Sequence, residues 1–267
     1  MGSRGDALGI IACHMLEDEL VHVLSGDENV TRLLIVDSGV SKTLMPKLRS
    51  HCAGKALETV QEEKLSEMEV RGEGNILIWQ RPINLHIAPE ELKDEGLRCI
   101  NAVKDLCSSI LMFYGLCGNA FRNLEALTQG IDVPVTILKD ASGQVVDDCM
   151  GAAAGGVEAY LKLLRTHHGA FFLSPMWASD WRRFFVDIMV LHDPNDLEGA
   201  RYIFQYMNYT TVTMMCTGLG GNDEFHKDVG EFSKAFNLKM EEFPCNTSVV
   251  DSSYARAKGR MHRHQEL

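Results

Sequence analysis

The sequence has no apolar run long enough to cross a membrane, since every such run falls well short of the roughly 20 residues that a transmembrane helix needs. Its first residues also lack the basic segment and apolar core of a secretory signal, so we expect none. A chain without such a signal is expected in the cytoplasm, where thiols stay reduced and disulfide bonds are rare.

Positive charge is scarce relative to negative charge. The chain has 26 Lys and Arg residues against 37 Asp and Glu residues, which gives a formal net charge of -11. Because phosphate groups are bound by clustered Lys and Arg, this balance disfavours binding to nucleic acid or to an anionic membrane. One basic cluster lies near the end of the sequence, and we expect residues 256–267 to form a solvated basic tail.

Several catalytic and metal-binding motifs are also absent. None of the eight cysteines forms a CxxC pair, so zinc ribbons and thioredoxin-like sites have no local support. The sequence contains neither the nucleophile elbow GxSxG nor the Ser-His-Asp order of a hydrolase triad. The glycine-rich turn at 217–222 lacks both the lysine of a P-loop and the spacing of the dinucleotide fingerprint GxGxxG.

What the sequence does contain is a regular alternation of apolar runs and amphipathic segments. The apolar runs predict nine strands, at residues 7–12, 32–36, 75–79, 108–113, 134–138, 169–173, 186–191, 210–215 and 239–243. Such alternation predicts an α/β fold of βαβ units with parallel sheets. We expect a single α/β unit over residues 1–267, built either as one large sheet split into lobes or as two or three small lobes around a central crevice. In the three-lobe arrangement the lobes would be residues 1–105, 106–183 and 184–267.

Five cysteines follow predicted strands or begin the next helix, and these are Cys13, Cys117, Cys149, Cys216 and Cys245. The other three, Cys52, Cys99 and Cys107, fall in or next to predicted helices and are expected to be packing residues. Because parallel strands point their carboxyl ends to the same edge of a sheet, thiols at strand ends are candidates to share one crevice.

Thiolates held at fixed geometry bind zinc or an iron–sulfur cluster. Histidines or the acidic Asp148 could complete or tune such a site. The predicted metal ligands are Cys13, His86, Cys117, Cys149 and Cys216. Whether His14 and Cys245 join them is left open.

Glycine-rich turns follow two of the predicted strands. Gly115 and Gly118 flank the thiol of Cys117, and the later turn contains Gly218, Gly220 and Gly221. Backbone amides in such turns could cradle a phosphate or carboxylate, so we expect these five glycines to contribute to cofactor binding.

Several short segments together resemble an uncharacterised family, domain of unknown function 1638. They are Ala-Cys at 12–13, Leu-His at 85–86 with Pro89, Tyr-Gly-Leu-Cys-Gly at 114–118, Asp-Cys at 148–149 and Pro-Met-Trp at 175–177. The sequence departs from the family pattern at His14, where a small residue is expected. The resemblance implies a protein of anaerobic metabolism, with a possible link to corrinoid-dependent methyl transfer. It also implies that Cys13, His86, Cys117 and Cys149 are the functional set.

Three functions remain open from the sequence. The first is a cytoplasmic protein that binds zinc or an iron–sulfur cluster. The second is a metal-free protein that binds a corrinoid, a nucleotide, another small molecule or a partner such as a corrinoid protein. The third is a transferase in which Cys117 or Cys149 acts as nucleophile, with His86 as its base.

Overall fold

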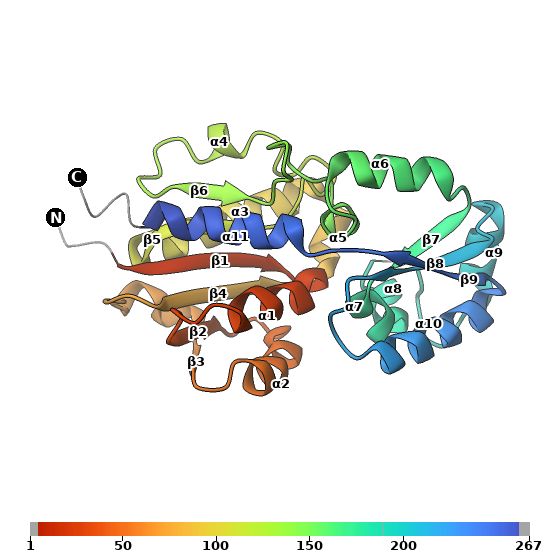
Figure 1. The fold of residues 1–267 in the computed structure, drawn as a ribbon, viewed down its shortest axis with the longest axis horizontal. Coiled ribbons are helices and arrows are strands. Elements are labelled where there is room, and N and C mark those ends of the chain that lie inside the picture. Colours follow the sequence, from red (N-terminus) through yellow and green to blue (C-terminus); the bar gives the residue numbers. More distant parts are fainter. Residues whose placement is uncertain (1–4, 189, 262–267) are drawn as a thin grey trace.

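The computed structural model describes residues 5–188 and 190–261, and it confirms a mixed α/β fold built on parallel sheets (Figure 1). One sheet has six strands in the order β3-β2-β4-β1-β5-β6, and the other has three in the order β7-β8-β9. The strands are β1 (Ala7–Cys13), β2 (Arg32–Val36), β3 (Ala56–Val60), β4 (Asn75–Arg81), β5 (Cys107–Phe113), β6 (Val135–Ile137), β7 (Ala170–Leu173), β8 (Thr211–Cys216) and β9 (Lys239–Pro244).

Helices and short 3-10 turns connect these strands. The α-helices are α1 (Glu17–Ser25), α2 (Ser41–His51), α3 (Pro89–Val103), α4 (Leu124–Leu127), α5 (Cys149–Ala153), α6 (Val157–Thr166), α7 (Pro175–Ser179), α8 (Trp181–Asp187), α9 (Glu198–Tyr206), α10 (Asn222–Phe236) and α11 (Ser248–Met261). The 3-10 turns are η1 (His14–Leu16), η2 (Glu62–Glu67), η3 (Ile83–Ile87) and η4 (Lys104–Leu106). Within the described ranges, no helix is both long and apolar enough to pass through a membrane.

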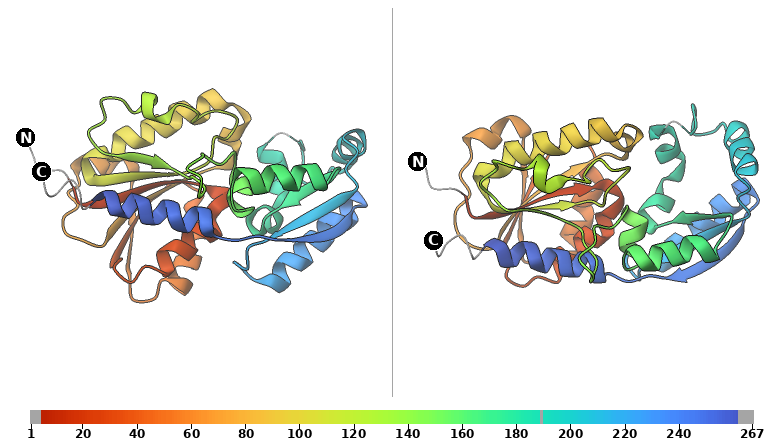
Figure 2. Two further views of the ribbon diagram at one scale, coloured as in Figure 1. Left: turned by 45° about the horizontal axis from the view of Figure 1, so that its top comes forward. Right: turned by 90° about the horizontal axis from the view of Figure 1, so that it is seen from above.

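The two sheets lie in two lobes, and the chain passes between the lobes twice (Figure 1). In the first lobe, β1 and β5 are buried along their whole length, as expected for parallel strands covered on both faces. Helix α3 lies on one side of this sheet and α11 on the other (Figure 2). The second lobe has its own aromatic core, in which the rings of Phe204 and Phe236 stack 4.3 Å apart.

The strand prediction is wrong in two places, although the number of strands agrees. Residues 186–191 were expected to form a strand, but Trp181–Asp187 is helix α8. Its buried Trp181, Phe184 and Phe185 recur at helical spacing and pack into the core. The additional strand is β3, an edge strand with mostly exposed or half-buried residues and therefore no apolar run to mark it.

The lobe boundaries differ from the three-lobe arrangement. Strand β5 begins just after the expected boundary at residue 105, yet it pairs with β1 in the larger sheet. The nine strands therefore form two sheets rather than three. Of the expected basic tail, residues 256–261 form the end of helix α11, and residues 262–267 lie outside the described part of the chain.

Helix α11 returns the chain to the first lobe, where polar contacts attach it to the end of α1. The hydroxyl of Tyr254 donates to Asp27 Oδ2 at 2.7 Å, and Lys258 forms an ion pair with the same oxygen. Burial would raise the pKa of Asp27, but the hydrogen bonds from Lys258 and Tyr254 outweigh it and lower that pKa below the usual value of 3.8. The carboxylate form of Asp27 therefore stabilises the docked helix.

We expect Asp27→Asn to lower the free energy of unfolding at pH 7 by about 1.5–3 kcal/mol, because a hydrogen bond to a charged group contributes about that much. Since the folded-state pKa is lowered, this contribution is present above about pH 4 and is lost as the pH falls through the folded-state value. Urea denaturation at pH 7 and pH 3 measures this contribution. The difference in the free energy of unfolding between wild type and Asp27→Asn should be smaller at pH 3 than at pH 7. The control is Glu28→Gln, which changes the exposed neighbouring residue and should have little effect at either pH. A difference of equal size at both pH values would contradict this assignment.

Candidate functional site

Two neighbouring strands, β1 and β4, bring two of the predicted residues into contact. Strand β1 lies between β4 and β5, and Cys13 is its last residue. His86 lies in η3, directly after β4. Cys13 Sγ is 3.5 Å from His86 Nε2. Parallel strands thus deliver a thiol and an imidazole to one edge of the sheet, as the sequence predicted.

The turn after β5 carries Cys117 in an unusual backbone conformation. Cys117, Gly118 and Asn119 have φ angles of 46°, 68° and 70°, so three successive residues occupy the left-handed region. Residues other than glycine are uncommon there, and such conformations persist where the surrounding structure imposes them. Here the amide of Cys117 donates to Asp147 O at 2.7 Å, which clamps the turn to the segment before Cys149.

Gly115 allows this clamp to form. A Cβ atom on Gly115 would lie 2.6 Å from the carbonyl oxygen of Val146 and 2.7 Å from that of Asp147. Both contacts are with backbone, which cannot move aside as a flexible side chain can. The role that the structure gives Gly115 is therefore close approach of two chain segments, and its part in cofactor binding stays a prediction.

Asp148 and Cys149 begin helix α5. The Asp148 side chain caps this helix by accepting a hydrogen bond of 2.9 Å from the amide of Gly151. Burial raises the pKa of Asp148, while a hydrogen bond from Tyr160 acts in the opposite direction. Tyr160 was not singled out from the sequence, because a tyrosine in an amphipathic helix has no distinguishing local pattern.

Burial keeps the thiols of this region protonated and the imidazole neutral. It raises the pKa of Cys13 to about 12 and that of Cys117 and Cys149 well above the usual value. The negative charge of Asp148 adds to the effect at both Cys117 and Cys149, and a thiolate at Cys13 would raise both pKa values further, so the three thiols lie in one electrostatic environment. Burial also lowers the pKa of His86 to about 4.

A cleft of about 670 Å³ lies between the two lobes next to these residues. From the first lobe it is lined by Ile83, His86 and Ile87, and from the following chain by Asp148, Cys149 and Met150. The opposite wall is largely aromatic and includes Tyr160, Phe171, Phe172, Trp177 and Tyr209. The volume and the mixture of apolar and polar groups are typical of a site for a small molecule.

Cys216 lies elsewhere. It ends β8 in the second sheet, where its thiol is 3.6 Å from Met214 O. Its carbonyl accepts a hydrogen bond of 2.9 Å from the amide of Cys245, so these two cysteines are neighbours. Cys216 is not among the residues that line the interlobe cleft, and its part in a metal site stays a prediction.

Three of the other predicted glycines lie in the turn before helix α10. Gly218 and Gly220 have positive φ angles of 77° and 75° in the turn before α10, which explains a glycine at each position. Gly221 is the N-cap of that helix. Neither these glycines nor Gly118 lines the interlobe cleft, and their part in cofactor binding stays a prediction.

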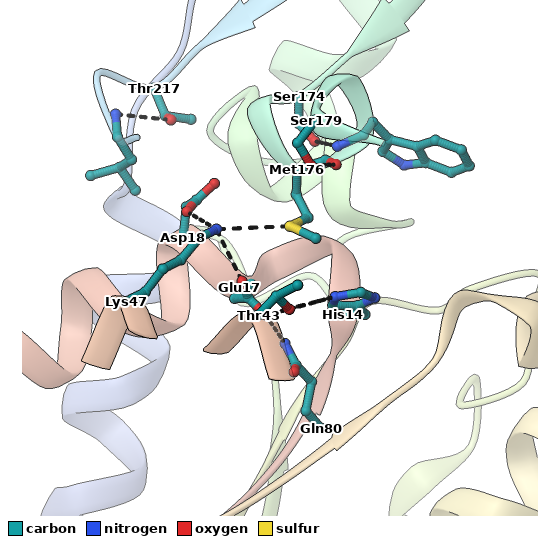
Figure 3. Close-up of polar contacts among 12 residues, drawn as sticks. His14, Glu17, Asp18, Thr43, Lys47, Gln80, Ser174, Met176, Ser179 and Thr217 are labelled. Atoms are coloured by element: carbon teal, nitrogen blue, oxygen red, sulfur yellow. Dashed lines mark hydrogen bonds and ion pairs between the residues drawn. The ribbon is translucent and has the colours of Figure 1, made fainter. Parts of the chain in front are cut away.

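A second polar network, centred on Glu17, lies where the lobes meet (Figure 3). The carboxylate of Glu17 is fully buried and accepts hydrogen bonds from Gln80 Nε2 at 2.9 Å and Thr43 Oγ1 at 2.7 Å. Lys47 Nζ lies 3.0 Å from Glu17 Oε1 and 2.6 Å from Asp18 Oδ1. The same ammonium group is 3.8 Å from Met176 Sδ of the second lobe.

His14 belongs to this second network. Its Nε2 atom lies 3.1 Å from Thr43 Oγ1, and its ring packs edge-on against Phe184. The sequence placed Glu17 and Glu19 in the first turn of a helix, where acidic residues are favoured, and gave no sign that they are buried. Burial raises the pKa of Glu19 to about 7.

The predicted ligands are not assembled into one coordination sphere. Within residues 5–188 and 190–261, no group of three or more His, Cys, Asp or Glu residues is arranged to hold a metal ion. Cys13 and His86 are in contact, Cys117 and Cys149 lie in the same environment, and Cys216 is in the other sheet. The structure thus shows a contacting pair with two nearby thiols, and the five-residue ligand set stays a prediction.

The comparison with protein families confirms the resemblance found in the sequence. The family model described as "Protein of unknown function (DUF1638)" matches residues 81–254, which include His86, Cys117 and Cys149. No curated protein matches the chain. Because the match spans more than half of the sequence, the protein belongs to the DUF1638 family.

Proposed function

We propose that the protein binds a soft metal ion beside the interlobe cleft, through Cys13, His86, Cys117 and Cys149. The observation that carries the proposal is the 3.5 Å contact between Cys13 Sγ and His86 Nε2. Three thiols and an imidazole are donors that zinc and iron–sulfur clusters accept. All eight cysteines are free thiols, in keeping with the cytoplasmic location that we also propose.

The contacting pair fits a zinc site. With Zn–S and Zn–N bonds of about 2.3 and 2.05 Å and a tetrahedral angle, the sulfur and nitrogen atoms of two ligands lie about 3.5 Å apart. Cys13 Sγ and His86 Nε2 have this separation. The remaining thiols have to move closer, because the described residues hold no preformed group of three ligands.

The movement is easier at Cys149 than in the clamped turn of Cys117, because Cys149 is the first residue of a helix of only five residues. Both thiols are protonated when no cation is near, so metal binding would release their protons. When bound, zinc would supply a Lewis acid beside the cleft. His86 and Cys149 line the cleft, so a molecule held by its aromatic wall would reach these donors.

Elemental analysis of anaerobically purified protein tests the proposal. We expect about one zinc ion, or iron in the amount of one cluster, per chain. Cys13→Ala and Cys117→Ala should each lower the metal content at least about tenfold, since each removes a ligand. Cys52→Ala is the matched control, because Cys52 is buried at the end of α2 and lies outside the cleft. Metal content that is negligible in wild type, or equal in all three variants, would refute the proposal.

A second candidate function is the binding of a small organic molecule, or of a corrinoid, without a metal ion. The observation that favours it is the interlobe cleft of about 670 Å³ with its aromatic wall. Equilibrium dialysis of metal-free protein with a corrinoid separates the two functions. Binding that Trp177→Ala weakens and Cys13→Ala leaves unchanged would support this second function.

The geometry gives less support to a nucleophilic cysteine. Burial raises the pKa of Cys117 and lowers that of His86, so neither group is in the charge state of an activated thiolate–imidazolium pair. The thiol that His86 contacts is Cys13 rather than Cys117.

A further inference from the structure

A second hollow, on the first lobe, has a charge opposite to that of the whole protein. It has a volume of about 690 Å³ and shares no lining residue with the interlobe cleft. Its walls come from the chain around α4, from the edge strand β6 and from helix α11. Among the described strands, β6 pairs only with β5, so the hollow runs along an edge of the six-stranded sheet.

Four basic side chains line this hollow, against a single acidic one. The basic residues are Arg122, Lys139, Arg256 and Arg260, and the acidic residue is Glu125. The chain as a whole has 26 basic and 37 acidic residues, so the local balance is the reverse of the overall one. The four basic residues of the hollow come from three separate parts of the sequence, and the fold brings them together.

The basic side chains of the hollow form no ion pairs with other described residues. Among the described residues, no ion pair involves Arg122, Lys139, Arg256 or Arg260. Arg256 Nη2 donates to two uncharged acceptors, Lys139 O at 2.7 Å and Ser253 Oγ at 3.1 Å. These bonds hold its guanidinium at the wall of the hollow without a carboxylate partner among the described residues.

We propose that this hollow binds a small molecule that carries a phosphate or a similar multiply charged oxyanion. Arginine guanidinium groups match the geometry of oxyanions and bind them through paired hydrogen bonds. The volume falls in the range of small-molecule sites. A nucleic acid would extend beyond the four basic residues onto a protein surface of net charge -11, which would repel it.

Calorimetric titration with inorganic pyrophosphate, in sodium chloride buffers of matched ionic strength, tests the proposal. We expect saturable binding that Arg122→Gln and Arg260→Gln each weaken at least about tenfold, since a hydrogen bond to a charged group is lost in each. Both side chains are exposed and form no ion pair with the described residues, so the variants should fold normally. Arg182→Gln is the matched control, because that arginine pairs with Glu231 in the second lobe.

Three results would overturn the proposal. Pyrophosphate could fail to bind the wild type at millimolar concentration, or it could bind Arg122→Gln and Arg260→Gln as tightly as the wild type. The third result is that a poly-glutamate peptide binds through these arginines and pyrophosphate does not, which would assign the hollow to an acidic protein segment. Oxyanion binding in this hollow does not depend on metal binding beside the interlobe cleft, so a negative result for one proposal leaves the other standing.

Discussion

Replacing Glu17 with alanine is expected to lower the free energy of unfolding by about 3–5 kcal/mol, the cost of breaking a buried ion pair by removing one partner. Glu17 is fully buried and accepts hydrogen bonds from Gln80 and Thr43. Its removal leaves the buried amide of Gln80 without this acceptor and leaves Lys47 with Asp18 alone. Guanidinium denaturation at neutral pH measures the change.

The control for this experiment is Asp18→Asn. Asp18 pairs with the same ammonium group of Lys47 but lies nearer to solvent, so its loss should cost about 1 kcal/mol or less. Burial would lower the pKa of Lys47, but Glu17 and Asp18 outweigh it and raise that pKa above its usual value of 10.5. The contribution of the Lys47 ammonium is therefore fully present at neutral pH, and as the pH rises it is lost only in strong alkali. Equal losses in Glu17→Ala and Asp18→Asn would contradict a buried network centred on Glu17.

Gly115→Ala is expected to lower the free energy of unfolding by about 1–3 kcal/mol, which is the usual cost of overpacking. The added methyl group would meet the carbonyl oxygens of Val146 and Asp147 at 2.6 and 2.7 Å. The two segments must separate, and this would stretch the hydrogen bond of 2.7 Å from the amide of Cys117 to Asp147 O. We therefore expect weaker metal binding in this variant as well as lower stability.

Gly199→Ala provides the comparison for Gly115→Ala. Gly199 lies in helix α9, and a Cβ atom there would have no atom within 4 Å. Alanine is favoured over glycine in a helix by about 1 kcal/mol, so this variant should be as stable as wild type or slightly more so. Urea denaturation measures the free energy of unfolding of both variants. A loss in Gly115→Ala alone identifies the close backbone approach as its cause, rather than a general effect of replacing glycine with alanine. A Gly115→Ala variant with wild-type stability would contradict the tight contact between the two segments.

The sequence predicts the fold class well, because long apolar runs identify the buried strands at the centre of the sheet. It cannot identify β3, an edge strand in which only Val60 is buried. It also mistakes the apolar segment around Val186 for a strand, since a short apolar run does not by itself distinguish a strand from a buried helix.

The candidate site is predicted in part. Cys13 ends β1 and His86 follows β4, and these two strands are neighbours. The expectation that parallel strands bring residues at their carboxyl ends together therefore predicts this contact. The same reasoning groups Cys216 with them, and the sequence does not reveal that its strand belongs to the second sheet. The buried Glu17 network escapes the sequence analysis because acidic residues at a helix start are usually exposed.

The most direct test of metal binding at the cleft is a titration of the reduced, metal-free protein with Co²⁺, followed by absorption spectroscopy under anaerobic conditions. Tetrahedral thiolate ligation predicts strong ligand-field bands and sulfur-to-cobalt charge-transfer bands that saturate at about one ion per chain. Both should be lost or much weakened in Cys13→Ala and kept in Cys52→Ala. A spectrum of hydrated Co²⁺ in the wild type, or an unchanged spectrum in Cys13→Ala, would contradict a metal site formed by Cys13, His86, Cys117 and Cys149.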